Sequence, residues 1–432
     1  MAYLFITTFI LTIIAFFIND KEIIAPGFLF SASFFVASLF CVLNIRNWGA
    51  DLNEITYWVI VLGILEFILV SGFIRIMFKR QYHLRSSNSK ILNIQKAHFK
   101  IGVLEVIQIL FILIIMYTTV RITGEKDIFK AINLMNYSSN GFISESYTLP
   151  TYAKMMQTFN FGVGILGEYL FLRELIINKN FSKLLFIEIF LGFTSSLLNG
   201  SRGGVFFAII AIIVFILLIQ KTEGNFNFKK YIKTIFVVFI LILITLLLME
   251  ETTVWVGRGK EDRSIFEYIS IYIGAEIKNL DIFISNQIFP VKTDIFGQQT
   301  FITIYDFLIK HMHLNIQSYT LNLPFQIVNG FSLGNVYTTF YPWLYDFGYQ
   351  GVFILTFVMA TISEIIYEYA LKSSSHFAPY LKLFYGGTIA PCVAFAFFSN
   401  RFFEAMNIIN ISLTFLIWMV LNYLFRNDMY YS

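Results

Sequence analysis

The sequence predicts an all-α integral membrane protein that crosses the bilayer many times. Apolar residues make up 57% of the 432 positions and charged residues only 13%, and the mean hydropathy is +0.70. Aromatic residues, which are counted among these apolar ones, make up 19% of the chain, which fits a lipid-facing surface with aromatic belts at both interfaces. A composition this apolar and this poor in charge excludes a water-soluble domain. A helix needs about 20 mostly apolar residues to cross roughly 30 Å of hydrocarbon, and the chain is rich enough in apolar residues to form many such helices.

The apolar runs predict eleven spans in a single transmembrane domain of residues 1–432. The run at 2–18 is interpreted as the first span and not as a cleaved signal peptide, because it has no basic leading region and no small-residue cleavage site. The two cysteines, Cys41 and Cys392, both fall inside predicted spans, so neither a disulfide framework nor a thiolate metal site is expected. The eleven spans lie near 2–18, 24–43, 57–77, 101–118, 155–172, 181–198, 204–219, 232–249, 349–369, 380–398 and 404–424.

The basic loops give the orientation. Residues 79–100 contain six Lys or Arg and no acidic residue, so the positive-inside rule makes this loop cytoplasmic. The basic loops 173–183 and 221–233 fall on the same side when the spans alternate. The N-terminus is then outside and the C-terminus cytoplasmic. The outer face receives residues 119–153, the hairpin at Arg202, residues 250–347 and the turn at 399–401.

The outer segment 250–347 is the largest extramembrane piece. A loop of this length is uncommon unless it is functional or folded. Apolar residues with helical spacing, including Ile302, Tyr305 and Met312, predict a short amphipathic helix that lies on the membrane surface. The cytoplasmic loops are short, and we find neither a P-loop nor a dinucleotide fingerprint.

Arg202 stands in the hairpin Asn-Gly-Ser-Arg-Gly-Gly (199–204) between two spans. Charged groups at membrane depth cost several kcal/mol unless they face a cavity, a partner or the interface. Gly203 and Gly204 let a ligand approach the backbone closely, and the next helix begins there with free N–H groups and the positive end of its dipole. This pattern suits a phosphate or diphosphate. The alternative is a short loop whose arginine anchors the helix ends at the headgroups.

Three more outer arginines could join a diphosphate site, because a guanidinium matches phosphate oxygens with a fixed fork of donors. Arg258 and Arg263 follow the eighth predicted span, and Arg401 precedes the last span as Arg202 precedes the seventh. The alternative for Arg258 and Arg263 is that they are solvated loop charges paired with neighbouring acidic residues.

Asp346 is a candidate general base, because it stands where the ninth predicted span enters the membrane. A base must lie within hydrogen-bond reach of the hydroxyl that it activates. The alternative is that Asp346 serves as the N-cap of that helix.

His311 and His313 do not share a helix face at their spacing, so we expect no metal site. The net charge of +4 comes without a basic stripe, so we expect no nucleic-acid partner.

In layout and motifs the chain resembles the O-antigen polymerases, or oligosaccharide repeat unit polymerases (Wzy). The resemblance rests on 199–204, on Gly-Arg-Gly at 257–259, on Tyr-Ile-Gly-Ala-Glu-Ile-Lys-Asn-Leu-Asp at 272–281, and on the run from Gly334 to Gly351. Some members carry two outer loops with an Arg-x10-Gly spacing, and only Arg263 with Gly274 fits it here.

The resemblance implies a GT-C-like membrane glycosyltransferase in the bacterial inner membrane. Its substrate would be an oligosaccharide repeat unit on undecaprenyl diphosphate, and it would join repeat units at the periplasmic face without a cofactor. Arg202, Arg258 and Arg401 would hold the diphosphate, Asp346 would be the base, and Tyr337 and Asp281 would contact sugar. Membrane lipids, a chain-length regulator and a repeat-unit flippase are the implied partners.

Two other functions remain open. An O-antigen ligase would use the same donor, transfer the glycan to lipid A core and use a histidine as base, for which His311 and His313 are candidates. A flippase or secondary transporter for the lipid-linked unit should carry charges along its spans facing a central path. The arginines cluster at one face, which favours chemistry or ligand capture there.

Overall fold

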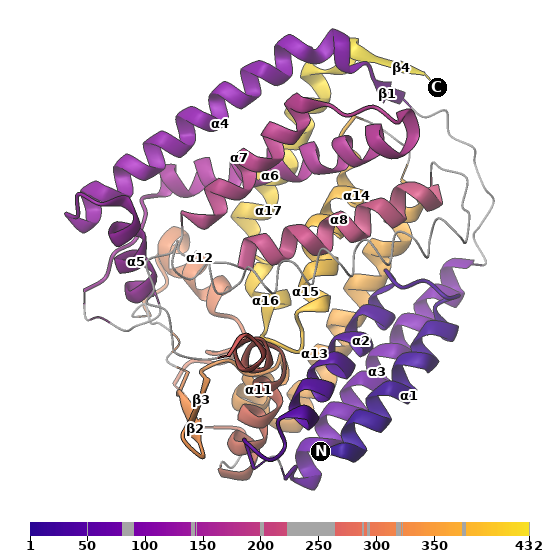
Figure 1. Ribbon diagram of the computed structural model, residues 1–432, viewed down its shortest axis with the longest axis vertical. Helices are drawn as coiled ribbons and strands as arrows, with labels where there is room; N and C mark the ends of the chain where they lie inside the picture. Colours follow the sequence, from indigo (N-terminus) through magenta and orange to yellow (C-terminus); the bar gives the residue numbers. More distant parts are fainter. Residues whose placement is uncertain are drawn as a thin grey trace. The chain divides into compact units, whose positions relative to one another are not determined.

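The computed structural model describes twelve stretches of the chain, most of them helical (Figure 1). The chain divides into two compact units, each considered by itself. The first unit contains Met1–His83, Arg263–Tyr369 and Cys392–Asn407, and the second contains Leu84–Asp262, Ala370–Pro391 and Ile408–Ser432. The described residues are 1–49, 51–79, 90–139, 143, 145–198, 203–222, 264–286, 289–291, 294–316, 321, 323–373 and 377–431.

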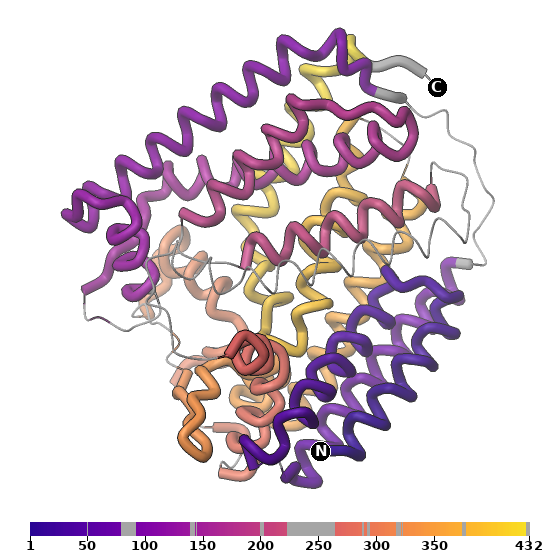
Figure 2. The backbone as a smooth tube through the Cα atoms, in the orientation of Figure 1, coloured from indigo at the N-terminus to yellow at the C-terminus, as the bar shows by residue number. Residues whose placement is uncertain are grey.

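Three neighbouring helices open the first unit: α1 (Ala2–Ile18), α2 (Pro26–Leu43) and α3 (Glu54–Lys79). They run side by side (Figure 2) and contact one another. Pro26 starts α2, where its missing N–H costs no helical hydrogen bond. The ring of Phe30 stacks on that of Phe67 at 4.2 Å between centroids, so aromatic packing joins α2 to α3.

Arg75, near the end of α3, is 4% exposed and holds the turn between α1 and α2. Its Nε lies 3.1 Å from Asp20 Oδ2, and its Nη2 lies 2.8 Å from Glu22 Oε2. The Tyr367 hydroxyl donates to Glu22, and the Tyr367 ring lies under the guanidinium at 5.9 Å. A buried charge is tolerated only when it is paired in this way.

The first unit also contains α11 (Ile265–Asn286), which contacts α2, α3 and one strand of a short hairpin. This helix packs against α2 at Gly274, where a Cβ would lie 2.7 Å from the Cys41 nitrogen, so only glycine allows the approach. A β-hairpin over residues 326–334 turns at Asn329 and Gly330, whose φ values of 50° and 81° are those of a type I′ turn. The other elements are α12 (Ile302–Met312), the strands β2 (Gln326–Val328) and β3 (Phe331–Gly334), α13 (Phe340–Lys372), which runs on into the second unit, and α16 (Arg401–Ala405).

The second unit is built around the contact between α6 (Thr151–Arg173) and α7 (Lys183–Leu197). Gly164 and Gly192 face each other there, and a Cβ on Gly192 would lie 2.7 Å from the Gly164 Cα. Small residues let the two backbones come this close, as is common between membrane helices. The unit also contains α4 (Ile94–Thr123), α5 (Ile128–Ser139), α8 (Gly203–Thr222), α17 (Ile408–Leu424) and a short strand pair of β1 (Lys90–Leu92) with β4 (Met429–Tyr431).

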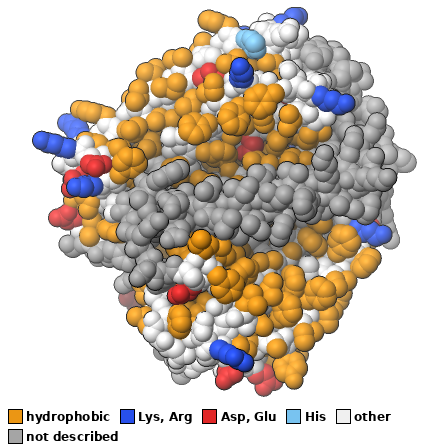
Figure 3. Space-filling view, in the orientation of Figure 1, with side chains coloured by type: hydrophobic (Ala, Val, Ile, Leu, Met, Phe, Trp, Pro, Cys, Tyr) orange, Lys and Arg blue, Asp and Glu red, His pale blue; other side chains and the backbone are white. Residues whose placement is uncertain are grey.

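The membrane class predicted from composition fits the structure. Five of the described helices are long and apolar enough to cross a bilayer, namely α2, α3 up to Phe78, α4, α8 and α13, and α1 and α17 are shorter apolar helices. Hydrophobic side chains dominate the face seen in Figure 3, where charged ones are few and scattered. The predicted eighth span, 232–249, lies outside the described residues.

The ninth, tenth and eleventh predicted spans differ from the helices of the structure. The ninth, expected from residue 349, is preceded by an earlier helical segment, and α13 kinks between the two at Gly348 (φ 66°, ψ −154°). The tenth, expected over 380–398, is interrupted by the π-helix η2 (Tyr385–Ile389) between α14 (Tyr380–Phe384) and α15 (Ala390–Ala394). Pro391 follows η2 and cannot donate to the helical ladder, which accounts for the irregular turn. The eleventh begins at Ile408 instead of 404.

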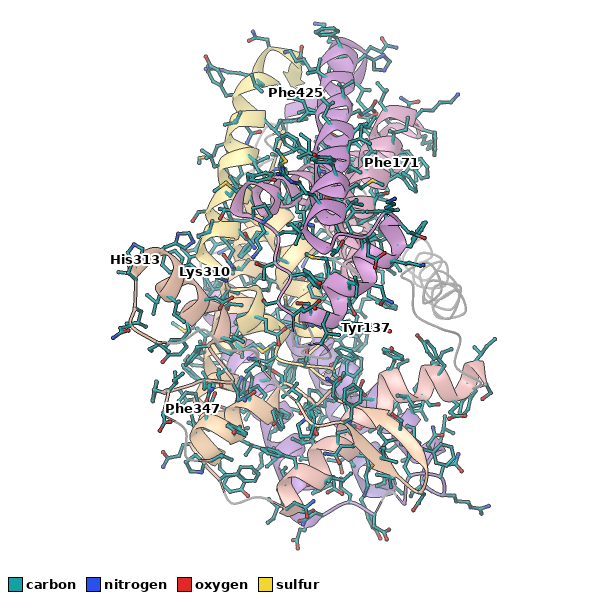
Figure 4. The ribbon with its side chains drawn as sticks, turned by 90° about the vertical axis from the view of Figure 1, so that its left-hand side faces the viewer. Tyr137, Phe171, Lys310, His313, Phe347 and Phe425 are labelled. Carbon is teal, nitrogen blue, oxygen red and sulfur yellow. The ribbon has the colours of Figure 1, made fainter. Side chains whose placement is uncertain are left out.

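The amphipathic helix predicted from residue 302 is confirmed as α12. None of its side chains is fully buried, and it contacts α16. His313 follows it in the left-handed conformation (φ 52°), so His311 and His313 do not belong to one helix. Figure 4 shows Lys310 and His313 projecting from this end of α12.

We predict that Gly192→Ala destabilises the second unit by about 1–3 kcal/mol, the usual cost of overpacking. The new methyl group would lie 2.7 Å from the Gly164 Cα and 3.1 Å from the Asn160 oxygen, both on a rigid helix backbone. Thermal unfolding of the purified protein in detergent measures the effect. The matched control is Gly102→Ala in α4, where a Cβ meets nothing within 4 Å. Equal midpoints for the two variants would contradict the close α6–α7 contact.

Candidate functional site

The structure describes six of the nine residues nominated by the sequence. Arg202, Arg258 and Arg263 lie outside the described residues. Asp281, Tyr337, Asp346 and Arg401 belong to the first unit, and Gly203 and Gly204 belong to the second.

Asp346 lies in the first part of α13, two residues before the kink at Gly348. Its Oδ2 accepts a hydrogen bond from Thr300 N at 2.7 Å, and its Oδ1 accepts one from Gln299 N at 3.2 Å. The carboxylate therefore binds the backbone that leads into α12, which differs from the N-cap that the sequence offered as its structural alternative.

Thr300 connects Asp346 to the turn that precedes Arg401. The Thr300 carbonyl accepts a hydrogen bond from Asn400 Nδ2 at 3.2 Å, while its hydroxyl donates to the Pro342 carbonyl at 3.1 Å. Asn400 is buried, and its Oδ1 accepts from Trp343 Nε1 at 3.1 Å. Two sequence-nominated segments, around residues 346 and 401, thus meet through one buried threonine.

Arg401 begins α16 and reaches solvent. Its side chain is 41% exposed, and Nη1 lies 3.1 Å from Glu404 Oε2 one turn later. The guanidinium also lies 5.9 Å from the centre of the Phe398 ring. Thr303 of α12 donates to the Phe403 carbonyl at 3.1 Å, which ties α16 to α12. A cation at this position is accessible to an anionic ligand.

Asp281 and Tyr337 are both buried and hydrogen-bonded. Asp281 Oδ1 accepts from Asn53 N at 2.9 Å and Thr56 Oγ1 at 2.8 Å, and Oδ2 lies 3.3 Å from Lys278 Nζ. The Tyr337 hydroxyl donates to the Pro324 carbonyl and accepts from Gln326 Nε2, each at 2.9 Å. Burial raises the pKa of Tyr337, so it stays a protonated donor. These contacts make both residues supports of the fold.

Gly203 and Gly204 form the first turn of α8, as the hairpin pattern predicts. A Cβ on Gly204 would lie 2.5 Å from Ser196 Oγ at the end of α7. Glycine therefore lets the two helices approach within the second unit at this point. The N–H groups of this first turn have the orientation that an anion site needs.

Thr300 and Trp343 are the residues of the site that the sequence did not reveal. Thr300 stands in a segment without a recognisable motif, Trp343 belongs to the run from Gly334 to Gly351 but was not singled out there, and Asn400 drew attention only as a neighbour of Arg401. Phe347 packs beside them, with its ring 5.9 Å from that of Phe301 (Figure 4). Within the described part of the chain, no group of three His, Cys, Asp or Glu side chains is placed to hold a metal ion.

We predict that Asn400→Ala lowers stability by about 1–3 kcal/mol, because it leaves the buried Trp343 Nε1 and the Thr300 carbonyl without a partner. Thermal unfolding of the purified protein measures the loss. Asn315→Ala, at an exposed position after α12, is the control and should leave the midpoint unchanged. If Asn400→Ala unfolded with the wild-type midpoint, the proposed junction at Thr300 would be wrong.

Comparison with known proteins does not assign the chain to a family, because no protein-family model, no curated protein and no solved structure matches it.

Proposed function

We propose that the protein is a membrane glycosyltransferase that joins oligosaccharide repeat units carried on undecaprenyl diphosphate, which is the reaction of an O-antigen polymerase. The observation that supports this proposal best is the network through Thr300, which links the Asp346 carboxylate to the turn bearing Arg401 within the first unit. An accessible guanidinium linked through Thr300 to a half-buried carboxylate suits a reaction in which an anionic group leaves and a hydroxyl attacks.

The chemistry requires two kinds of group. The leaving diphosphate gains negative charge, which preorganised arginines and helix N-termini stabilise. We assign Arg202, Arg258 and Arg401 to this role, with the first turn of α8 at Gly203 beside Arg202 in the chain. Because a diphosphate is already a good leaving group, neither a metal ion nor a general acid is part of the proposal. The acceptor hydroxyl needs a base, for which the sequence nominates Asp346.

The proposal includes the topology that the sequence predicts. Eleven spans would place the N-terminus and residues 250–347 outside the inner membrane and the C-terminus in the cytoplasm. α11, α12 and the β2–β3 hairpin would then lie at the periplasmic face, where lipid-linked repeat units are presented. Arg401 would face the same side as Arg202.

We predict that Arg202→Ala abolishes polymerisation in a strain whose own gene copy is deleted. Wild type should restore a surface glycan ladder of many repeats, whereas the variant at matched membrane abundance should leave lipid A core capped by one repeat unit. The control is Arg46→Ala, an exposed arginine after α2 that the topology places on the same outer face, and it should restore the full ladder.

Other outcomes would identify the alternatives. If the deletion strips the core of every repeat while long lipid-linked polymer accumulates, the protein is a ligase. If lipid-linked units accumulate at the cytoplasmic face, it is a transporter. Equal ladders from Arg202→Ala and Arg46→Ala would remove Arg202 from the diphosphate site.

A further inference from the structure

Glu276 is a buried carboxyl group in the middle of α11, and one of its oxygens has no partner in the part of the chain that the structure describes. Its side chain is 1% exposed, and Oε2 has no hydrogen-bond partner among the described residues. It belongs to the 272–281 motif but was not among the residues nominated from it. An unpartnered buried acceptor costs about 1–3 kcal/mol, a cost that a bound donor would remove.

The same face of α11 carries a second unmet acceptor. Asn279 lies one turn after Glu276, and side chains at this spacing are neighbours on a helix surface. Asn279 Nδ2 donates to the carbonyls of Leu333 and Val336, at 3.1 and 2.8 Å, while Oδ1 has no partner among the described residues. Glu276 and Asn279 therefore lie on the side of α11 that holds the chain between β3 and α13.

Aromatic rings continue this face. Phe283, one turn beyond Asn279, lies 4.3 Å from the ring of Tyr341 between centroids, and Tyr341 lies 4.4 Å from Tyr337. The unmet atoms of Glu276 and Asn279 accept hydrogen bonds, so they suit a ligand that donates them. Sugar hydroxyls are such donors, and ligand sites commonly combine a few convergent polar groups with aromatic walls.

Three carboxyl groups of the first unit, Glu276, Asp281 and Asp346, differ in the hydrogen bonds that their oxygens already accept. Asp281 is bound by two donors and paired with Lys278, and Asp346 accepts two backbone N–H groups. These bonds occupy the oxygens that would otherwise accept a proton from a sugar hydroxyl, although burial outweighs them at Asp346 and raises its pKa above the ordinary value. Glu276 Oε2 accepts no such bond from the described residues, and burial raises the pKa of Glu276 well above its ordinary value, which strengthens its ionised form as a base.

We propose that Glu276 is the general base that activates the acceptor sugar hydroxyl, with Asn279 orienting that sugar and Asp346 acting as a positioning residue. The inference rests on the proposed glycosyl transfer. The acceptor hydroxyl gives its proton to Glu276, and its oxygen forms the new bond to the anomeric carbon of the donor. The bond from that carbon to the lipid diphosphate breaks, and the diphosphate leaves with the electron pair.

The test compares Glu276→Gln with wild type in the deletion strain and in purified full-length protein. Glutamine keeps the shape of a protonated glutamate and its ability to donate, but it cannot take a proton. We expect transfer between lipid-linked repeat units, extracted from the deletion strain, to fall by about 10²–10⁴-fold, the usual contribution of a general base. The thermal shift induced by undecaprenyl diphosphate should stay at the wild-type value.

Two further readouts separate a base from a structural group. The ionised fraction of Glu276 grows as pH rises through its raised pKa, so the wild-type rate should rise with pH and the residual rate of Glu276→Gln should not. Glu267→Gln, half-exposed in the first turn of the same helix, is the matched control and should retain both the rate and the pH profile.

Each failure has its own signature. A wild-type protein that restores no ladder removes the proposed function itself. A wild-type ladder with an equally active Glu276→Gln overturns the assignment of the base alone. Loss of the ladder together with a lowered unfolding midpoint and lost diphosphate binding would make Glu276 a structural residue and would also overturn the inference.

Discussion

The position of α11 is the constraint on which the first unit depends, and a buried carboxylate fixes it. Asp281 binds the start of α3 through Asn53 and Thr56 and pairs with Lys278 on its own helix. On another face of α11, Asn279 holds the carbonyls of Leu333 and Val336. Because buried polar groups are expensive when unpaired, α11 cannot rotate or slide without losing several of these bonds at once.

Thr300 fixes a second point of the same unit in a different way. Its N–H, carbonyl and hydroxyl are all bonded, to Asp346, Asn400 and Pro342 respectively. A residue with every polar group bound to a different neighbour has one acceptable position. The chain leading into α12, the start of α13 and the turn before α16 are thereby set relative to one another, and the side chain of Arg401 is left free to reach solvent.

Some of these features can be predicted from the sequence and others cannot. The difference is whether a feature depends on residues close together in the chain or on contacts between residues far apart in it. Helices follow from local apolar runs, so α1 and α12 are found where expected. Departures such as the kink at Gly348 follow from single residues whose neighbours decide whether a helix continues. The contact of Thr300 with Asn400 joins residues a hundred positions apart, and no local pattern contains it. Glu276 could be read from its motif, but its unmet oxygen follows only from the packing of α11.

Arg75 and Arg401 of the first unit differ in how far their side chains are buried. Arg75, which is 4% exposed, is held by Asp20 and by the 18% exposed Glu22, and removing one partner of a buried ion pair such as Arg75–Glu22 costs about 3–5 kcal/mol. Arg401 is paired with Glu404 at 41% exposure, where an ion pair is worth only about 0–1 kcal/mol. A diphosphate brings more charge than one carboxylate and offers two oxygens to the guanidinium fork. Under the proposed function a diphosphate would replace Glu404 at Arg401, whereas displacing Glu22 would leave the buried charge of Arg75 without its best-buried partner.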